Sequence, residues 1–254
     1  MNRGKSIRAS LIANYLNKKL IGADLDIKEP KSISELSGNA ISFLQEEYFN
    51  SSIENIINQN TNSLVICSSN IKRRLKASVI ISKTPAFDFS KIIKKFFKCP
   101  KPKITIGKNF FKRKYAVIGG IGFGFRKNDQ GVQKRLTHIG GVTIGDNVEI
   151  GSFSTIDRGV LSNTIIGSDV KIDSHVHIAH NVIIGDGTLI TAGVIVGGSA
   201  VIGKKCFIGI NSSIRDHVKI GNNVFVGMGS VVVSDIPSNV TIIGNPARIL
   251  KKNI

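Results

Sequence analysis

The sequence has no tryptophan, two methionines and three cysteines, and its acidic residues are half as numerous as its basic ones. Cys67, Cys99 and Cys206 are odd in number and widely spaced, so neither a disulfide framework nor a zinc site is expected. No apolar run reaches the roughly eighteen residues of a membrane-spanning helix, and the N-terminus lacks the apolar stretch of a secretory signal. These absences predict a cytoplasmic protein with no transmembrane segment.

The shortage of acids is concentrated in one part of the chain. The formal net charge is +18, and residues 51–135 hold 19 Lys and Arg against three acids. Such a surface attracts phosphates, acidic carrier proteins, nucleic acid or anionic lipid, or it is simply a solvated basic face. Because no nucleic-acid-binding pattern is present and aromatic residues are 6% of the chain, no nucleic-acid partner is expected.

An aliphatic residue returns every six positions from residue 144 onward. A strict period of six fits neither an α-helix nor a simple alternating strand, but it fits a short strand followed by a tight turn. Three such units form one triangular coil of eighteen residues, and a ten-residue step from Ile156 to Ile166 loops out at one corner. The fifteen positions are Ile144, Ile150, Ile156, Ile166, Ile172, Ile178, Ile184, Ile190, Val196, Ile202, Ile208, Ile214, Ile220, Val226 and Val232.

The pattern resembles the hexapeptide repeat of the left-handed parallel β-helix. The predicted fold is therefore mainly β, with this β-helix preceded by a small α/β domain. Residues 1–100 lack the repeat and form the small domain, residues 101–235 form the β-helix, and residues 236–254 form a C-terminal tail. An earlier coil is expected near Ile106 and Ile118, followed by a Gly-rich, basic excursion.

The histidines separate the chemistries known on such β-helices, which include acyl transfer, zinc-dependent hydration and mere binding. His175, His177 and His180 are spaced so that they face different sides of the coil, so no metal site is expected. His180 precedes Gly198 by eighteen residues, which stacks the two in adjacent coils about 4.8 Å apart. A neutral imidazole beside a backbone N–H donor suits direct acyl transfer from a thioester to an amine. The alternative is that His180 and His217 are ordinary exposed polar residues.

Residues 170–203 resemble the catalytic stretch of the UDP-3-O-acylglucosamine N-acyltransferases of lipid A biosynthesis. The resemblance extends to residues 140–173, to GFGF at 122–125 and, loosely, to residues 33–44. It implies that His180 is the general base, Asp173 its polarising partner and Gly198 the oxyanion donor. It also implies that His217 binds the donor's phosphate-bearing arm, and that the protein is a homotrimer.

The resemblance assigns the small domain to nucleotide binding, with Phe43 on one side of the base and Tyr48, or Phe49 one position later, on the other. The family's Asn after the Phe-Leu pair is not evident in SFLQEEYF. The C-terminus departs further, because IIGNPARILKK is similar to the terminus of sugar acetyltransferases that use acetyl-CoA. That similarity implies CoA contacts by Gly244, Asn245, Pro246 and Ala247, and the alternative is a turn that ends the β-helix.

The function expected from these features is N-acyl transfer to the amine of a nucleotide-linked amino sugar in surface polysaccharide (lipopolysaccharide) biosynthesis. The preferred donor is a short acyl-CoA, acetyl-CoA above all, as co-substrate, with no bound cofactor. One alternative is the lipid A enzyme itself, using a hydroxyacyl chain on acyl carrier protein. Another, of a different class, is a non-catalytic trimeric binding scaffold.

Overall fold

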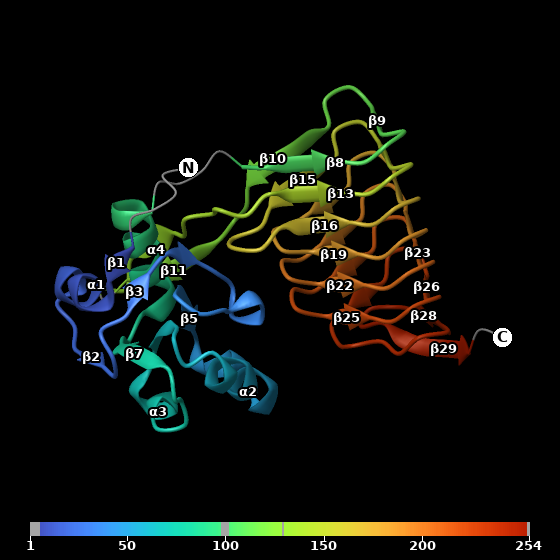
Figure 1. The fold of residues 1–254 in the computed structure, drawn as a ribbon. Coiled ribbons are helices and arrows are strands. Elements are labelled where there is room, and N and C mark those ends of the chain that lie inside the picture. The colour runs from blue at the N-terminus through green and yellow to red at the C-terminus, as the bar shows by residue number, and fades with distance from the viewer. Residues whose placement is uncertain (1–5, 98–101, 129, 253–254) are drawn as a thin grey trace. The chain divides into compact units, whose positions relative to one another are not determined.

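The computed structural model describes residues 6–97, 102–128 and 130–252, which form two compact units. The first unit comprises residues 1–100 and 124–137, and the second comprises residues 101–123 and 138–254. In Figure 1 the first unit carries the helices and the second is a stack of strands. The α/β unit and the parallel β-helix are both as predicted from the sequence.

The first unit is built on a five-stranded sheet with strands in the order β2, β7, β6, β5, β4. The strands β4 to β7 run parallel, and β2 is antiparallel to β7. A short antiparallel pair, β1 with β3, lies outside this sheet. The strands are β1 (Ile7–Arg8), β2 (Leu20–Ile21), β3 (Asp26–Ile27), β4 (Glu29–Pro30), β5 (Ala40–Leu44), β6 (Leu64–Cys67) and β7 (Ser78–Ile81). The α-helices are α1 (Ala9–Leu16), α2 (Ser51–Gln59), α3 (Ser69–Lys72) and α4 (Pro85–Phe96), and the 3₁₀ helices are Ile33–Glu35 and Glu46–Tyr48.

A buried carboxylate ties the end of α1 to α4. Asp88 has no exposed surface, and its oxygens lie 2.6 Å from the Lys18 ammonium and 2.8 Å from that of Lys91. The Ser82 hydroxyl donates to the same carboxylate at 2.6 Å. Burial raises the pKa of Asp88, but the hydrogen bonds from Lys18, Lys91 and Ser82 outweigh it, so the pKa lies below its usual value.

An antiparallel hairpin of β11 (Phe125–Lys127) and β12 (Gln133–Arg135) completes the first unit. Its base is fixed to α4, because the Thr137 N–H donates to the Ser90 hydroxyl at 2.9 Å. The units divide between residues 100 and 101, where the boundary was predicted, but residues 124–137, which were expected in the β-helix, belong to the first unit. This return of the chain to the first unit involves no aliphatic period, so the sequence pattern did not indicate it.

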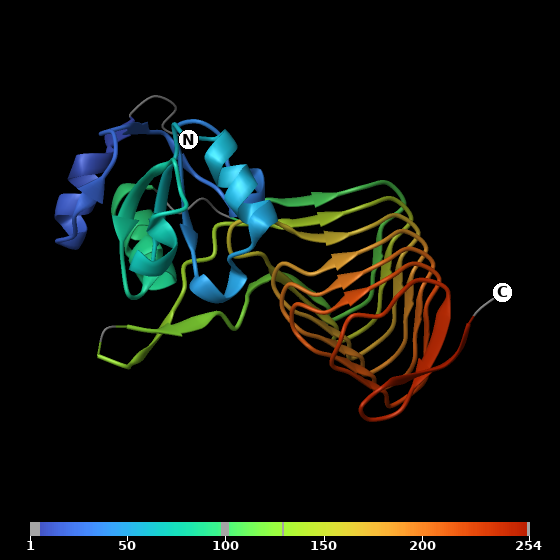
Figure 2. The ribbon, with the colours of Figure 1, turned by 90° about the horizontal axis from the view of Figure 1, so that it is seen from below.

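The second unit is a β-helix with three faces, named here in chain order (Figure 2). Each face is a parallel sheet, except that β29 joins the second face as an antiparallel strand. The corner that follows the first face is called the first corner, and the second and third corners are named in the same way. The first face holds β8 (Ile104–Ile106), β13 (Val142–Ile144), β16 (Thr164–Ile166), β19 (Ile183–Ile184), β22 (Val201–Ile202) and β25 (Lys219–Ile220). The second holds β9 (Phe111–Lys112), β14 (Glu149–Ile150), β17 (Lys171–Ile172), β20 (Leu189–Ile190), β23 (Phe207–Ile208), β26 (Phe225–Val226), β28 (Val240–Ile243) and β29 (Arg248–Lys252). The third holds β10 (Val117–Ile121), β15 (Thr155–Arg158), β18 (His177–Ile178), β21 (Ile195–Val196), β24 (Ser213–Ile214) and β27 (Val231–Val232).

The strand register gives the β-helix its core. Ile178 pairs with Val196, and Val196 with Ile214, so equivalent residues lie eighteen positions apart. Because side chains alternate along a strand, the repeating Ile or Val and the residue two positions before it both point inward. These residues form one continuous buried cluster along the axis, in which Ile178 is fully buried. The predicted first coil is also present, since Ile106 pairs with Ile144 and Ile118 with Ile156.

The last coil corrects the predicted end of the β-helix. Residues 236–254 were expected to form a separate tail, but in the described part of this segment Ile236 bridges Ile220, and β28 pairs in parallel with β26. Ile236 and Ile242 are buried in the same core. Val226 is opposite Ile242, sixteen residues later, so this coil is two residues short and leaves the period of six.

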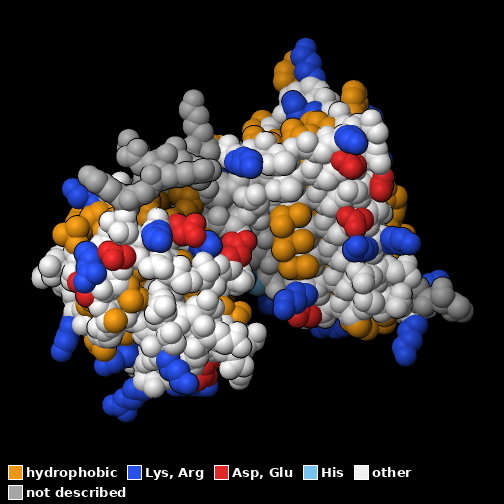
Figure 3. All heavy atoms as spheres, in the orientation of Figure 1, with side chains coloured by type: hydrophobic (Ala, Val, Ile, Leu, Met, Phe, Trp, Pro, Cys, Tyr) orange, Lys and Arg blue, Asp and Glu red, His pale blue; other side chains and the backbone are white. Residues whose placement is uncertain are grey.

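Part of the first face is apolar at its surface. Ile165 on β16 and Ile183 on β19 are adjacent in register and are 38% and 40% exposed. Figure 3 shows hydrophobic side chains gathered on this face of the stacked coils, with Lys and Arg scattered elsewhere. Among the described residues, none of the helices has the length and apolar character needed to cross a bilayer.

Candidate active site

His180 lies at the third corner of the β-helix, directly after β18. The Ser199 N–H donates to the His180 carbonyl at 2.9 Å, and the His217 N–H donates to the Gly198 carbonyl at 3.0 Å. Successive coils therefore bring His180, Gly198 and His217 to the same corner, as their spacing predicted. His180 is half-buried, whereas His217 is exposed, and its Nε2 lies 3.9 Å from the Asp216 carboxylate.

Gly198 is packed against the His180 imidazole. A Cβ added at Gly198 would lie 2.8 Å from Cε1 of His180 and 2.9 Å from its Nε2, closer than real side chains approach. Only glycine thus lets the ring occupy this place. Within the described part of the chain, the Gly198 N–H donates to no backbone carbonyl, so the corner that holds His180 also holds an N–H outside the backbone ladder. The stacking of His180 on Gly198 is the geometry expected from the sequence.

Two further residues confine the imidazole, and sequence reasoning gave neither a role. The His138 ring is almost fully buried and meets the His180 ring edge-on, with centroids 5.7 Å apart. A Cβ at Gly122 would lie 2.9 Å from Cβ of His180 and 3.1 Å from Nε2 of His138. Gly122 and His138 both belong to the excursion that leaves the coil before residue 140, so no repeat spacing relates them to His180.

The Asn181 side chain has an orientation that backbone groups fix. Its Oδ1 accepts a hydrogen bond from the Val160 N–H at 2.9 Å, and its Nδ2 donates to the Ser162 carbonyl at 3.0 Å. Because an N–H only donates and a carbonyl only accepts, the amide cannot be flipped without losing both bonds. Asn181 thereby holds the four-residue insertion, which loops out at this corner as the sequence predicted.

The fixed amide determines the tautomer of His180. Nδ1 of His180 lies 3.2 Å from Oδ1 of Asn181, which is an acceptor, so Nδ1 carries the proton. In the neutral ring the lone pair is then on Nε2, the nitrogen on the Gly198 side. Nε2 is the atom that a general base needs. Sequence reasoning did not assign this function to Asn181, and the only signal was its position directly after His180.

Asp173, predicted as the polarising partner of His180, lies at the second corner, after β17. His180 lies at the third corner, so one whole side of the triangle separates them within the chain. Because each side of the coil takes six residues, a spacing of seven puts two residues at successive corners, so the period itself separates Asp173 from His180 within one chain. Within one chain the observed partner of Nδ1 is therefore Asn181, in place of the predicted Asp173.

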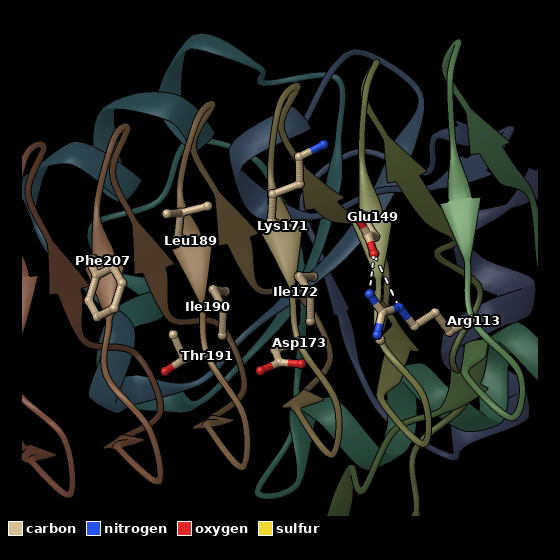
Figure 4. Close-up of a pocket in the computed structure, with 10 residues that line it drawn as sticks. Arg113, Glu149, Lys171, Ile172, Asp173, Leu189, Ile190, Thr191 and Phe207 are labelled. Atoms are coloured by element: carbon tan, nitrogen blue, oxygen red, sulfur yellow. Dashed lines mark hydrogen bonds and ion pairs between the residues drawn. The ribbon is translucent and has the colours of Figure 1, made fainter.

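Asp173 instead lines a hollow of about 250 Å³ on the outer surface of the second face. Figure 4 shows the Asp173 carboxylate next to Thr191, with Leu189 and Phe207 along the neighbouring strands. The Arg113 guanidinium and the Glu149 carboxylate, 2.9 Å apart, close one end of the hollow. The hollow thus combines an apolar wall with charged groups.

The four residues predicted to contact CoA form the loop between β28 and β29. The loop continues from the second face, the Val231 N–H donates to the Gly244 carbonyl at 3.0 Å, and the Ala247 N–H donates to the Val231 carbonyl at 2.8 Å. Gly244, Asn245 and Pro246 are exposed, whereas Ala247 is buried. The segment is a turn at the end of the β-helix, and it presents three residues to solvent.

Of the two predicted nucleotide contacts, Phe43 lies within a strand of the first unit and Tyr48 lies beyond the end of that strand. Phe43 is within β5 and packs against Phe89 of α4, with ring centroids 5.1 Å apart. Tyr48 ends the 3₁₀ helix that follows β5, at the carboxyl edge of the parallel sheet, and is 37% exposed. Glu46, in the same helix, accepts hydrogen bonds from Ser68 and Asn70, which follow β6. The carboxyl edge of a parallel sheet is a common ligand-binding location.

Comparison with family models identifies the repeats. Residues 163–198 and 199–234 match the model described as bacterial transferase hexapeptide, six repeats. The matched coils are hexapeptide repeats of this kind, and they include His180 and Gly198. The model covers less than half of the chain.

Curated relatives and solved structures agree with this match. A UDP-3-O-acylglucosamine N-acyltransferase of Ectopseudomonas mendocina is 56% identical over 77 residues, which is 30% of this chain and 22% of the relative. One from Pseudomonas putida is 54% identical over 77 residues, which is again 30% of this chain and 22% of the relative. The alignment thus spans about a fifth of the length of these relatives.

The structural neighbours include enzymes named LpxA. The LpxA of Acinetobacter baumannii is 25% identical with a TM-score of 0.50, covering 59% of this chain and 64% of that one. The UDP-N-acetylglucosamine O-acyltransferase of Moraxella catarrhalis is 22% identical with a TM-score of 0.52, covering 90% and 72%. The second likeness concerns the fold alone.

Proposed function

We propose that this hexapeptide-repeat protein is an N-acyltransferase that moves an acyl group from a thioester to the amine of a nucleotide-linked amino sugar. The observation that carries the proposal is the imidazole of His180, whose proton is on Nδ1 and whose Nε2 faces Gly198. The name of the 56% identical relatives supports an amino-sugar acceptor and an amide product.

In the proposed reaction, the sugar amine attacks the thioester carbonyl carbon while Nε2 of His180 takes a proton from the nitrogen. The new C–N bond forms as the carbonyl oxygen becomes an oxyanion, which the Gly198 N–H stabilises. When the tetrahedral intermediate collapses, the C–S bond breaks, and the proton on Nε2 passes to the departing thiolate. The products are an amide and a free thiol, and no serine or cysteine nucleophile takes part.

The donor is the point on which two versions of the proposal differ. Acyl-CoA, with acetyl-CoA first, is supported by the solvent-facing Gly244, Asn245 and Pro246. A hydroxyacyl chain on acyl carrier protein is supported by the similarity to the relatives named UDP-3-O-acylglucosamine N-acyltransferase. In both versions the first unit binds the nucleotide near Tyr48, and the protein acts in the cytoplasm.

A homotrimer completes the proposal. Ile165 and Ile183 form an exposed apolar strip on the flat first face, which a second copy would cover. In a closed ring, the second corner of one copy with Asp173 can approach the third corner of the next. Size-exclusion chromatography with light scattering tests the trimer directly.

The test of the function is mass spectrometry of UDP-linked amino sugars, with and without a 3-O-acyl chain, incubated with each donor in turn. A product heavier by one acyl group, lost in His180→Ala, is the expected result. Lys204→Ala is the control, because Lys204 is exposed at the first corner, where it pairs with Asp186. A fully active His180→Ala protein would refute the catalytic assignment, and ligand binding without any product would favour the scaffold.

A further inference from the structure

The hairpin of residues 125–135, called here the basic hairpin, is a two-stranded ribbon rich in cations. Arg126, Lys127, Lys134 and Arg135 lie on its strands, and the only acid in the segment is Asp129. All four basic side chains are exposed, as is Gln133. Figure 2 shows the ribbon extending outward from the sheet and helices of the first unit. Its faces are thus not used to cover the core.

The strand register places like charges directly opposite one another. Arg126 pairs with Lys134 across the hairpin, and Lys127 pairs with Gln133. Like charges at opposing positions of an antiparallel pair destabilise it. Among the described residues, no carboxylate lies within ion-pair distance of Arg126, Lys127 or Lys134. An anion outside the chain would relieve this repulsion.

The ribbon is nevertheless held in a defined position at its base. The Leu136 N–H donates to the Gly124 carbonyl at 2.8 Å, and Leu136 is buried. Thr137 is hydrogen-bonded to Ser90 of α4, as described above. Since an isolated two-stranded hairpin is only marginally stable in water, this attachment keeps the cations together at the surface.

We infer that the basic hairpin docks the protein on an anionic lipid bilayer. Binding to such a surface is additive over the cations and needs no shape complementarity. Val132, 48% exposed near the tip, adds an apolar side chain that can enter the headgroup region. The inference concerns the first unit alone and does not depend on the proposed reaction.

Two other polyanions fit the ribbon less well. A stable protein partner needs about 800 Å² of contact with an apolar centre, and Val132 is the one exposed apolar side chain on the described part of the basic hairpin. Single-stranded nucleic acid needs aromatic faces for base stacking. Phe125 is the one aromatic residue there, and the Arg135 guanidinium covers its ring at 4.4 Å.

The experiment is co-sedimentation of the full chain with vesicles of phosphatidylcholine alone or mixed with phosphatidylglycerol. We expect binding only to the mixed vesicles, and its loss at about 1 M salt, where the Debye length falls to about 3 Å. Each cation near an anionic surface contributes about a fivefold gain in affinity, so Arg126→Gln with Lys134→Gln should weaken binding about 25-fold.

The matched control is Lys251→Gln with Lys252→Gln, which removes the same charge from the exposed strand β29. This control should bind the mixed vesicles as the unmodified protein does, and circular dichroism melting should show both double variants folded. Equal weakening in the two double variants, or equal binding to neutral vesicles, would overturn the inference. So would binding of an oligonucleotide or an acidic protein without any binding of vesicles.

Discussion

Replacing Gly198 with alanine tests the central geometry of the candidate site. The added Cβ would lie 2.8 Å from Cε1 of His180, whereas ordinary contacts begin at 3.4 Å, so the ring must retreat by at least about 0.6 Å. The retreat disturbs the 3.2 Å contact between Nδ1 and Asn181. Misplacing a catalytic group by about 1 Å costs on the order of 100-fold in rate, so we expect kcat/KM to fall by about 30- to 100-fold, or about 2–3 kcal/mol.

The same substitution should hardly affect folding. The atoms that must move are at the far end of one half-buried side chain, so the free energy of unfolding should change by less than about 1 kcal/mol. Gly38→Ala is the control, because its nearest neighbour, Cβ of Asn62, would be 3.9 Å away. Initial rates by product mass spectrometry, together with urea unfolding, give both quantities. An unchanged kcat/KM in Gly198→Ala would refute the placement of the reaction beside His180.

Three further predictions concern the tautomer, the buried charge and the core. Asn181→Ala should lower kcat by about 10- to 100-fold while Ser199→Ala, one coil along, has little effect, and equal rates would contradict the tautomer assignment. Asp88→Asn should destabilise the first unit by about 3–5 kcal/mol in urea unfolding, because it leaves the partly buried Lys18 without its counter-ion. Because the pKa of Asp88 is lower in the folded protein, the Asp88 carboxylate stabilises the fold at pH values above 3.8, the unfolded pKa. This stabilisation is lost as the pH falls through the folded pKa. A free energy of unfolding that does not decrease in acid would contradict the lowered pKa. Ile178→Ala should cost about 2–5 kcal/mol in the same assay, and a loss below about 1 kcal/mol would mean that the coil collapses to fill the cavity.

Most of the fold prediction, namely the β-helix and its strand pairing, follows from the six-residue period of aliphatic residues. The pairing of Ile178 with Val196 follows from counting alone, because in the regular coils each residue has a partner eighteen positions away. Across the looped-out insertion the offset is 22, as between Ile156 and Ile178. The count failed at the last coil, where the step from Val226 to Ile242 is sixteen. In the first unit, the short aliphatic runs at 63–67 and 77–81 predict strands, and the structure has β6 and β7 there. The amphipathic pattern of residues 87–97 predicts a helix, which is α4. Helix α2 was not predicted.

The candidate site could be predicted only where it follows the coil spacing. His180 and Gly198 are one coil apart, and the structure stacks them. The roles of Asn181 and His138 depend on where the looped-out insertion and the returning chain lie, which no local period encodes. Asp173 is only seven residues from His180 in the sequence, but it lies at a different corner of the coil. Closeness in sequence therefore does not predict closeness in the site.

The position of the candidate site along the stack has a consequence for its motions. Each coil contacts only its two neighbours, so opening of the β-helix begins at its ends and spreads inward. On the third face, β18 and β21, which precede His180 and Gly198, are the third and fourth of six strands. Fluctuations that fray the terminal coils therefore fade before they reach the imidazole. Amide hydrogens around residues 178–198 should exchange more slowly than those of β10 or β27, so the site keeps its geometry while the ends of the stack open and close.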